Sequence, residues 1–365
     1  MERDVVYGGE VIEGPNQILN DDGGLRFGFA TGWVIGCVGG ACLKIGHLRI
    51  FAGLVVPLGV LTGLRLGVMV ALPTEIAWLD ADEVPGPALP LGERVLLEGR
   101  GTTFVRRVKG PAGAPTVLLI HGWCASGGLN WFQAFDAVGE RFSILAPDLR
   151  GHGRGMRTPE RFRLRDCADD LAALIESEKC GPVIAVGYSM GGPVAQLLWK
   201  RHPHLVSGLV LCATGSEFVS GYPARATFAA AMTIASRGLR IGGHMNFVPH
   251  AIGKRIFGGR APTRPSSFAG WVRDEFRRHD LRLVTEAGRA VSAFSSGRWI
   301  GRINVPTTVL VTTNDRAVNA ENQEQLAHAI PGARIMRMDE THLACTSPEF
   351  GKRILKACLD VQDRI

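Results

Sequence analysis

The chain has 365 residues, of which 46% are hydrophobic and 21% charged, a balance typical of a globular protein. The formal net charge is +7, but the sequence lacks the basic and aromatic patterns of nucleic-acid-binding proteins, so nucleic acid is not an expected partner. The eight cysteines are scattered singly without a Cys-x-x-Cys pair, which argues against a zinc site or a disulfide framework.

An acidic segment, residues 1–26, is followed by a long apolar stretch, residues 27–72. Glycine recurs at every fourth position in this stretch, at Gly28, Gly32, Gly36 and Gly40 and again at Gly59, Gly63 and Gly67. Each such glycine costs about 1 kcal/mol against alanine in a soluble helix, whereas small faces help helices to pack in lipid. We therefore predict a hydrophobic helical hairpin embedded in a membrane, with a soluble packed pair of helices as the alternative.

This hairpin sets the predicted location of the protein. Residues 50–72 are long enough to span a bilayer, whereas residues 27–43 are slightly short. The basic turn at residues 44–49 is the better cytoplasmic candidate, and two spans would then put the rest of the chain on the outer face. We expect a membrane-associated protein, with a cytoplasmic one as the alternative. The glycine faces can also mediate self-association.

Residues 73–91 are rich in proline and predict a linker, after which short apolar runs alternate with helical patterns. The predicted strands are Glu93–Leu97, Thr103–Val108, Thr116–Ile120, Ser143–Ala146, Val183–Val186, Leu209–Cys212, Thr307–Thr312 and Ala333–Met338, and the clearest helices are Leu164–Glu178 and Pro193–Trp199. This alternation predicts an α/β fold with a mostly parallel, doubly wound sheet.

The strand pattern is interrupted between residues 219 and 297, where we predict a helical cap. The core then consists of residues 92–218 and 298–365. Arginines between the apolar runs of the cap fit either a lid that faces an anionic lipid surface or an ordinary solvated lid.

A serine turn lies at the centre of this pattern, Gly187-Tyr188-Ser189-Met190-Gly191-Gly192. A Gly-x-Ser-x-Gly run between a strand and a helix is typical of a nucleophile elbow, in which the serine hydroxyl stands out of the sheet. Gly187 and Gly191 lack a Cβ atom, so the strand and the helix can approach closely. The helix N-terminus would stabilise a developing negative charge.

Four motifs in this order resemble the α/β-hydrolase superfamily, in particular its serine esterases and lipases. They are His121-Gly122-Trp123, Asp148-Leu-Arg-Gly-His-Gly153, the serine turn, and a closing pair formed by Asn314-Asp315 and Thr341-His342. The resemblance covers about residues 92–362 and leaves residues 1–91 outside.

The resemblance implies a triad in the chain order serine, acid, histidine. Ser189 is the expected nucleophile, His342 the base and Asp315 the acid that orients the histidine. Glu217 is the alternative acid, because some relatives place it after the strand that ends at Cys212.

The backbone N–H groups of Trp123 and Met190 are the expected oxyanion hole. The Trp123 side chain either lines the pocket or packs in the core. Asp148 and His152 resemble a structural loop of the family. We expect no metal and no cofactor, because the sequence has no convincing metal-ligand set, phosphate loop or dinucleotide fingerprint.

These residues predict a serine hydrolase that cleaves a carboxylic ester through an acyl-enzyme, with a small hydrophobic or lipid-like ester favoured. One alternative uses the same triad for thioester or C–C bond hydrolysis or for acyl transfer. The other is a non-catalytic binding protein on the hydrolase scaffold.

Overall fold

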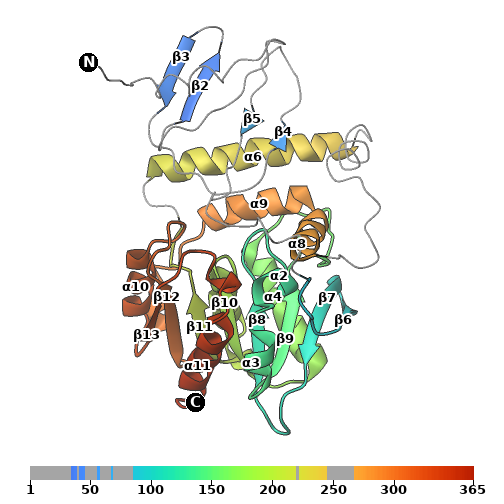
Figure 1. Ribbon diagram of the computed structural model, residues 1–365, viewed down its shortest axis with the longest axis vertical. Coiled ribbons are helices and arrows are strands. Elements are labelled where there is room, and N and C mark those ends of the chain that lie inside the picture. Colours follow the sequence, from blue (N-terminus) through green and yellow to red (C-terminus); the bar gives the residue numbers. More distant parts are fainter. Residues whose placement is uncertain are drawn as a thin grey trace, which may run out of the picture. The chain divides into compact units, whose positions relative to one another are not determined.

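The computed structural model describes residues 85–218, 222–244 and 267–365, together with four short strands nearer the N-terminus (Figure 1). Contacts between residues divide the chain into two units, Met1–Ile76 and Ala77–Ile365. Within the described parts, no helix combines the length and the apolar character needed to cross a membrane.

The described residues of the first unit are strands, although the sequence predicted helices there. β2 (Val34–Val38) pairs with β3 (Ala41–Ile45), and β4 (Val56–Pro57) pairs with β5 (Gly67–Val68), both antiparallel. Valine and isoleucine favour strands, and the recurring glycines weaken a helix, so the local preferences oppose the predicted helices. The rest of residues 27–72 lies outside the described residues, and the membrane attachment stays a prediction.

The second unit contains an eight-stranded sheet in the order β13-β12-β11-β10-β8-β9-β7-β6. The strands are β6 (Gly92–Leu97), β7 (Gly101–Val108), β8 (Thr116–Ile120), β9 (Ser143–Asp148), β10 (Val183–Tyr188), β11 (Val206–Cys212), β12 (Thr307–Thr312) and β13 (Arg334–Met338). Neighbours from β13 to β9 are parallel, whereas β7 is antiparallel to both β9 and β6. The predicted mostly parallel sheet is confirmed.

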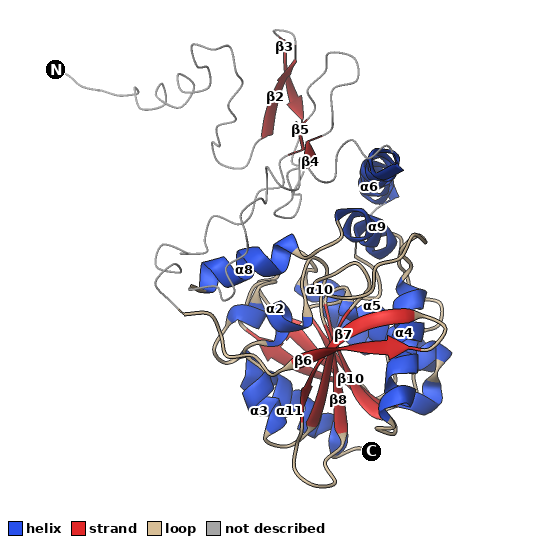
Figure 2. Cartoon of the chain, turned by 90° about the vertical axis from the view of Figure 1, so that its right-hand side faces the viewer, coloured by secondary structure: helices blue, strands red, loops and turns tan. Residues whose placement is uncertain are grey.

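Helices cover both faces of this sheet (Figure 2). One face carries α4 (Leu164–Glu178), α5 (Gly191–Arg201) and α10 (Ala320–Ala329), and the other carries α2 (Gly127–Trp131), α3 (Phe135–Gly139) and α11 (Phe350–Gln362). Short 3-10 turns are at Pro203–Leu205, Ile300–Arg302 and Ala344–Thr346. The predicted doubly wound arrangement is therefore present.

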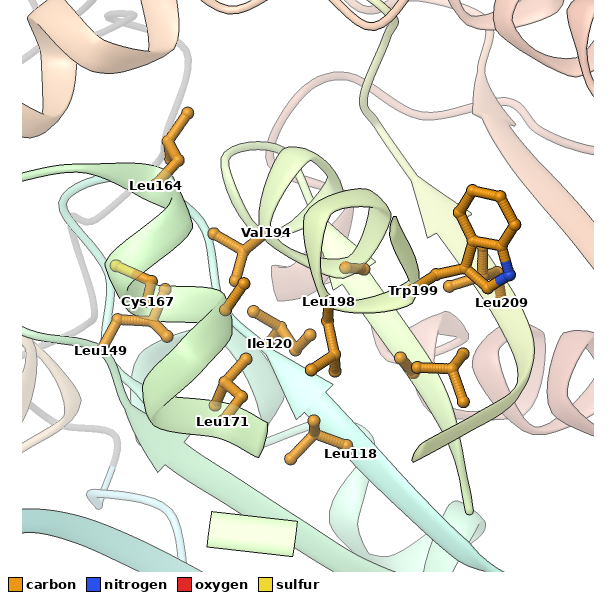
Figure 3. Close-up of a cluster of buried hydrophobic side chains, with 14 of the residues drawn as sticks. Leu118, Ile120, Leu149, Leu164, Cys167, Leu171, Val194, Leu198, Trp199 and Leu209 are labelled. Carbon is orange, nitrogen blue, oxygen red and sulfur yellow. The ribbon is translucent and has the colours of Figure 1, made fainter. Parts of the chain in front are cut away.

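Alternation along the strands builds the two cores. In β8, Leu118 and Ile120 face the cluster that includes α4 and α5, whereas Val117 and Leu119 face the cluster that includes α2, α3 and α11. Figure 3 shows Leu118 and Ile120 among side chains of α4 and α5, such as Leu171 and Leu198. This packing fixes α5, whose first turn follows the serine turn.

The order of the strands has a topological switch point at β8. β8 is followed in the chain by β9 on one side, and the next strand, β10, lies on the other side of β8. In open α/β sheets, ligands bind beyond the carboxyl ends of the strands at such a switch point. The residues that follow β8 and β10 are therefore the expected site.

Three described helices lie in the segment that was predicted to be a cap. They are α6 (Tyr222–His244), α8 (Phe268–Arg277) and α9 (Leu281–Ser292). α6 packs along α9 (Figure 1). Residues 219–221 and 245–266 of this segment lie outside the described residues.

Candidate active site

Ser189 occupies a strained turn between β10 and α5. Its φ of +49° lies in the left-handed region, which serine rarely adopts. A Cβ atom on Gly187 would lie 2.4 Å from the Gly191 carbonyl oxygen, and one on Gly191 would lie 2.1 Å from the Ile120 carbonyl oxygen. Only glycine fits at both positions, as the nucleophile-elbow interpretation requires.

The structure brings Ser189, His342 and Asp315 together in one hydrogen-bonded chain. The Ser189 Oγ and His342 Nε2 atoms are 3.0 Å apart, and His342 Nδ1 lies 2.7 Å from Asp315 Oδ2. Asp315 follows β12, and His342 lies in the loop after β13. This arrangement allows the histidine to accept the serine proton while the carboxylate holds the imidazole in the required tautomer.

The Asp315 carboxylate is buried and firmly oriented. Its Oδ1 atom accepts hydrogen bonds from the backbone N–H groups of Ala317, at 2.7 Å, and Val318, at 3.0 Å. Its Oδ2 atom accepts a hydrogen bond from the Thr312 hydroxyl at 2.8 Å. Oδ1 therefore anchors the carboxylate to the backbone, whereas Oδ2 faces His342.

Glu217, the alternative acid, differs from Asp315 in its exposure to solvent and in its position relative to His342. The Glu217 side chain is exposed, and the Asp315 carboxylate occupies the position beside His342 Nδ1. A buried, oriented carboxylate suits the acid of a triad better than an exposed one. The geometry therefore favours Asp315.

The segments that carry Trp123 and Met190 both border Ser189. Met190 follows Ser189 directly and is the last residue before α5 begins. A Cβ atom on Gly122 would lie 3.3 Å from the Ser189 Cβ atom, and the Gly122 N–H donates to Asn130 Oδ1 at 2.8 Å. The use of the Trp123 and Met190 N–H groups as an oxyanion hole stays a prediction.

The Trp123 side chain lies against the cap. Its Nε1 atom donates a hydrogen bond to the Val284 carbonyl of α9 at 2.7 Å. A Cβ atom on Gly288 would lie 2.7 Å from the Trp123 ring, so only glycine allows α9 this close approach. Phe228 of α6 meets the same ring edge to face, with 6.4 Å between the centroids. The cap therefore covers the loop next to Ser189 with apolar surface.

Two residues that shape the site were missed in the sequence. Asn130 fixes Gly122 from a short helix, and Gln323 of α10 donates to the Thr312 hydroxyl at 2.8 Å, behind Asp315. Both are buried. Amide side chains in helices give no sequence signal of this kind, because the turn that brings them to the site is set by tertiary packing.

Asp148 and His152 hold the loop after β9, in line with the structural role expected of them. Asp148 accepts hydrogen bonds from the Gly127 N–H at 2.7 Å and from the Arg154 N–H at 2.8 Å. Burial raises the pKa of Asp148 to about 6. His152 is fully buried between His121, whose ring is tilted against it at 5.4 Å between centroids, and His279, which meets it edge to face at 5.6 Å.

This row of histidines predicts that the protein loses stability in mild acid. Burial lowers the pKa of His121 to about 3, of His279 to about 4, and of His152 well below its ordinary value. Because an unfolded histidine titrates near about 6.5, the folded protein binds fewer protons and loses stability below that pH. Asp148 opposes this, since its raised pKa adds stability as the pH falls from about 6 toward 4.

Between pH 7 and pH 5, we expect each of the three histidines to lower the free energy of unfolding by about 2 kcal/mol. Over the same range, Asp148 should raise it by about 1 kcal/mol. Urea denaturation at the two pH values measures this change in the free energy of unfolding. His279→Asn keeps an acceptor for the Gly153 N–H, now bonded at 2.8 Å, and should reduce the loss by about 2 kcal/mol. His328→Asn, an exposed control on α10, should not. Greater stability at pH 5 than at pH 7 would contradict this account.

Tyr188 is predicted to position His342. Its hydroxyl donates to the His342 carbonyl at 2.7 Å, and burial raises its pKa well above the ordinary range, so the donor stays protonated. If His342 is the base, Tyr188→Phe should lower kcat about tenfold with little change in KM, and cost about 1 kcal/mol of stability. Steady-state kinetics and urea denaturation measure both. Reduced stability with an unchanged kcat and pH profile would show that Tyr188 only supports the fold.

Comparison with known proteins shows which family this chain belongs to. A family model described as the alpha/beta hydrolase fold matches residues 115–345. The magnesium-chelatase 30 kDa subunit of Rhodobacter capsulatus is 30% identical over 250 residues, covering 64% of this chain and 82% of that protein. The pimeloyl-acyl-carrier-protein methyl ester esterase of Chromobacterium violaceum is 37% identical over 105 residues, covering 29% of this chain and 39% of the esterase.

A solved structure shares the fold over most of this chain. A hydrolase from Pseudomonas aeruginosa has a TM-score of 0.58 at 22% identity, covering 74% of this chain and 98% of that one, which shows the shared fold. Together with the family model, which matches more than half of the sequence, these findings show that the chain belongs to the α/β hydrolase fold family.

Proposed function

We propose that the protein is a serine hydrolase that cleaves a carboxylic ester through an acyl-enzyme. The observation that carries the proposal is the chain of hydrogen bonds from Ser189 through His342 to Asp315, next to the N-terminus of α5. Such a chain turns a weakly nucleophilic hydroxyl into an effective one.

The reaction proceeds in two halves. Ser189 Oγ attacks the ester carbonyl carbon as its proton moves to His342 Nε2, and the N–H groups of Trp123 and Met190 hold the oxyanion. The leaving alcohol takes the proton from His342. Water then attacks the acyl-enzyme, with His342 again accepting and returning the proton, and the acid and free Ser189 are released.

A hydrophobic acyl group is the proposed substrate class. Trp123, whose ring meets Phe228, follows Gly122, and Gly122 lies beside Ser189, so the acyl group would extend over this apolar surface. The same triad also supports thioester or C–C bond hydrolysis, or acyl transfer to an acceptor other than water. Attachment of residues 27–72 to a membrane, which stays a proposal, would bring the site close to lipid-like esters.

Two measurements test this function. A fluorophosphonate probe should label the protein, with the modification found on Ser189 by mass spectrometry. Para-nitrophenyl esters of increasing acyl length should show a kcat/KM that rises with chain length. If neither labelling nor turnover is detected in the folded protein, the ester hydrolase proposal is wrong.

The match to the magnesium-chelatase subunit favours a second candidate, an accessory subunit in magnesium chelation without catalysis of its own. It belongs to the class of non-catalytic proteins on the hydrolase scaffold. Labelling of Ser189 together with ester turnover would contradict this candidate, whereas a folded protein inert to both would support it.

A further inference from the structure

A basic cavity lies outside the Ser189 site. It has a volume of about 320 Å³ and is lined by Arg94, Gly101, Thr102, Arg154, Gly155, Met156 and Arg157. Small-molecule sites span about 300–1,000 Å³, so the cavity is at the lower end of that range. Its lining contains three guanidinium groups and no carboxylate. A pocket lined with this charge attracts an anion.

Arg154 is held in place before any ligand arrives. Its guanidinium lies 2.9 Å from Glu275 Oε1 and 5.0 Å from the centre of the Phe104 ring. Glu275 also pairs with Arg278, at 3.1 Å, so one carboxylate is shared between two cations. The charge around Arg154 is therefore only partly neutralised by the protein.

Arg157 is fixed by backbone oxygens rather than by an acid. It donates to the carbonyls of Gly155, at 2.7 Å, and Gly153, at 2.8 Å, and also to the carbonyl of Arg278. Carbonyls satisfy its N–H groups but carry no net charge. Partial desolvation lowers the pKa of Arg157, and repulsion from Arg94 adds to this effect, although Asp280 and Asp148 act in the opposite direction.

Arg94 completes the group from the β6–β7 hairpin. It pairs in register with Phe104, and Thr102 lies two residues from Phe104 on the same face of β7. Arg94 is exposed, and no carboxylate within the described ranges forms an ion pair with it at 4.0 Å or less. The lining therefore combines one exposed guanidinium, that of Arg94, with two that the protein holds in place, and it includes Thr102.

We propose that this cavity binds a phosphate group of a small molecule or of a lipid headgroup. A phosphate dianion can accept hydrogen bonds from several guanidinium groups at once, and arginine matches its geometry in a bidentate manner. A single carboxylate carries half the charge and has fewer acceptor atoms. The site is separate from Ser189, so this binding does not depend on the proposed hydrolysis.

Isothermal titration calorimetry of the full-length protein with pyrophosphate tests the proposal. We expect saturable binding at one site, weakened by added sodium chloride, and much weaker binding of acetate. Arg94→Gln removes one charged donor that forms no ion pair with a carboxylate of the described ranges, and it should weaken the affinity about tenfold or more. The control Arg141→Gln makes the same charge change at an exposed position before β9 and should leave the affinity unchanged.

The source of the phosphate is separated by two further titrations. Glycerol 3-phosphate represents a soluble ester, and neutral phosphatidylcholine vesicles containing phosphatidic acid represent a lipid headgroup. Binding that Arg94→Gln weakens, in either case, supports the site and identifies its ligand class. Absence of saturable binding to all three probes, or equal weakening by Arg94→Gln and Arg141→Gln, would overturn the proposal.

Discussion

Ser189→Ala will abolish ester hydrolysis, with a loss of about four to six orders of magnitude in kcat. The alanine has no Oγ atom to attack the substrate, although His342 and Asp315 stay in place. The fold should survive, because the backbone bonds of residue 189, from its N–H to the Cys212 carbonyl and from Gly192 to its carbonyl, at 2.9 Å each, do not involve the side chain.

Hydrolysis of a para-nitrophenyl ester and labelling by the fluorophosphonate probe measure the effect, with circular dichroism to confirm the fold. Ser177→Ala is a matched control, since it removes an exposed hydroxyl that donates to the Leu174 carbonyl on α4. If Ser189→Ala hydrolyses the ester at the wild-type rate, the proposed mechanism is wrong. Equal losses in both variants would indicate a general effect on folding.

Asp315→Asn will lower kcat by about three to four orders of magnitude, because the site dictates which way the amide points. The N–H groups of Ala317 and Val318 donate to Oδ1 and require an oxygen there. The amide nitrogen must then take the Oδ2 position and donate to His342 Nδ1. The imidazole proton is then forced onto Nε2. Because Nε2 already carries a proton, it can no longer accept the one from Ser189.

Glu217→Gln makes the same chemical change at the alternative acid and should alter kcat less than twofold. Its side chain is exposed, so an amide there is readily solvated. Steady-state kinetics of the two variants decides between the acids. If Glu217→Gln proves the more damaging, the acid of the triad lies after β11, and the contact between Asp315 and His342 only supports the fold.

Much of the core was predictable because its signals are local. The alternation of apolar runs and turns placed β8, β12 and α4 at the residues where the structure has them. The serine turn could be identified because a strained, glycine-flanked elbow allows few sequences. Asp315 and His342 were expected from the chain order that the resemblance to α/β hydrolases implies, after the last two predicted strands.

The remaining features depend on packing between distant segments. No local pattern indicates that Gly288 must be glycine for α9 to approach Trp123, or that Arg154 and Phe104 stack beside a cavity. The helical prediction for residues 27–72 relied on glycine spacing, but glycine spacing does not separate close-packed helices from strands. In the described part of that segment, the β-branched residues coincide with strands.

The separation of Ser189 and His342 along the chain has a consequence during synthesis. The two residues are 153 positions apart, and the helical cap is translated between them. At roughly 5–20 residues per second, a ribosome needs roughly 8–30 s to pass from one to the other. If His342 is the base of the proposed triad, the nascent chain contains Ser189 without that base for this time, and α11, whose Gly351 lies against the Gln133 carbonyl, is translated later still. Under the proposed mechanism, a chain that ends before residue 342 would contain the elbow but lack the histidine that activates Ser189.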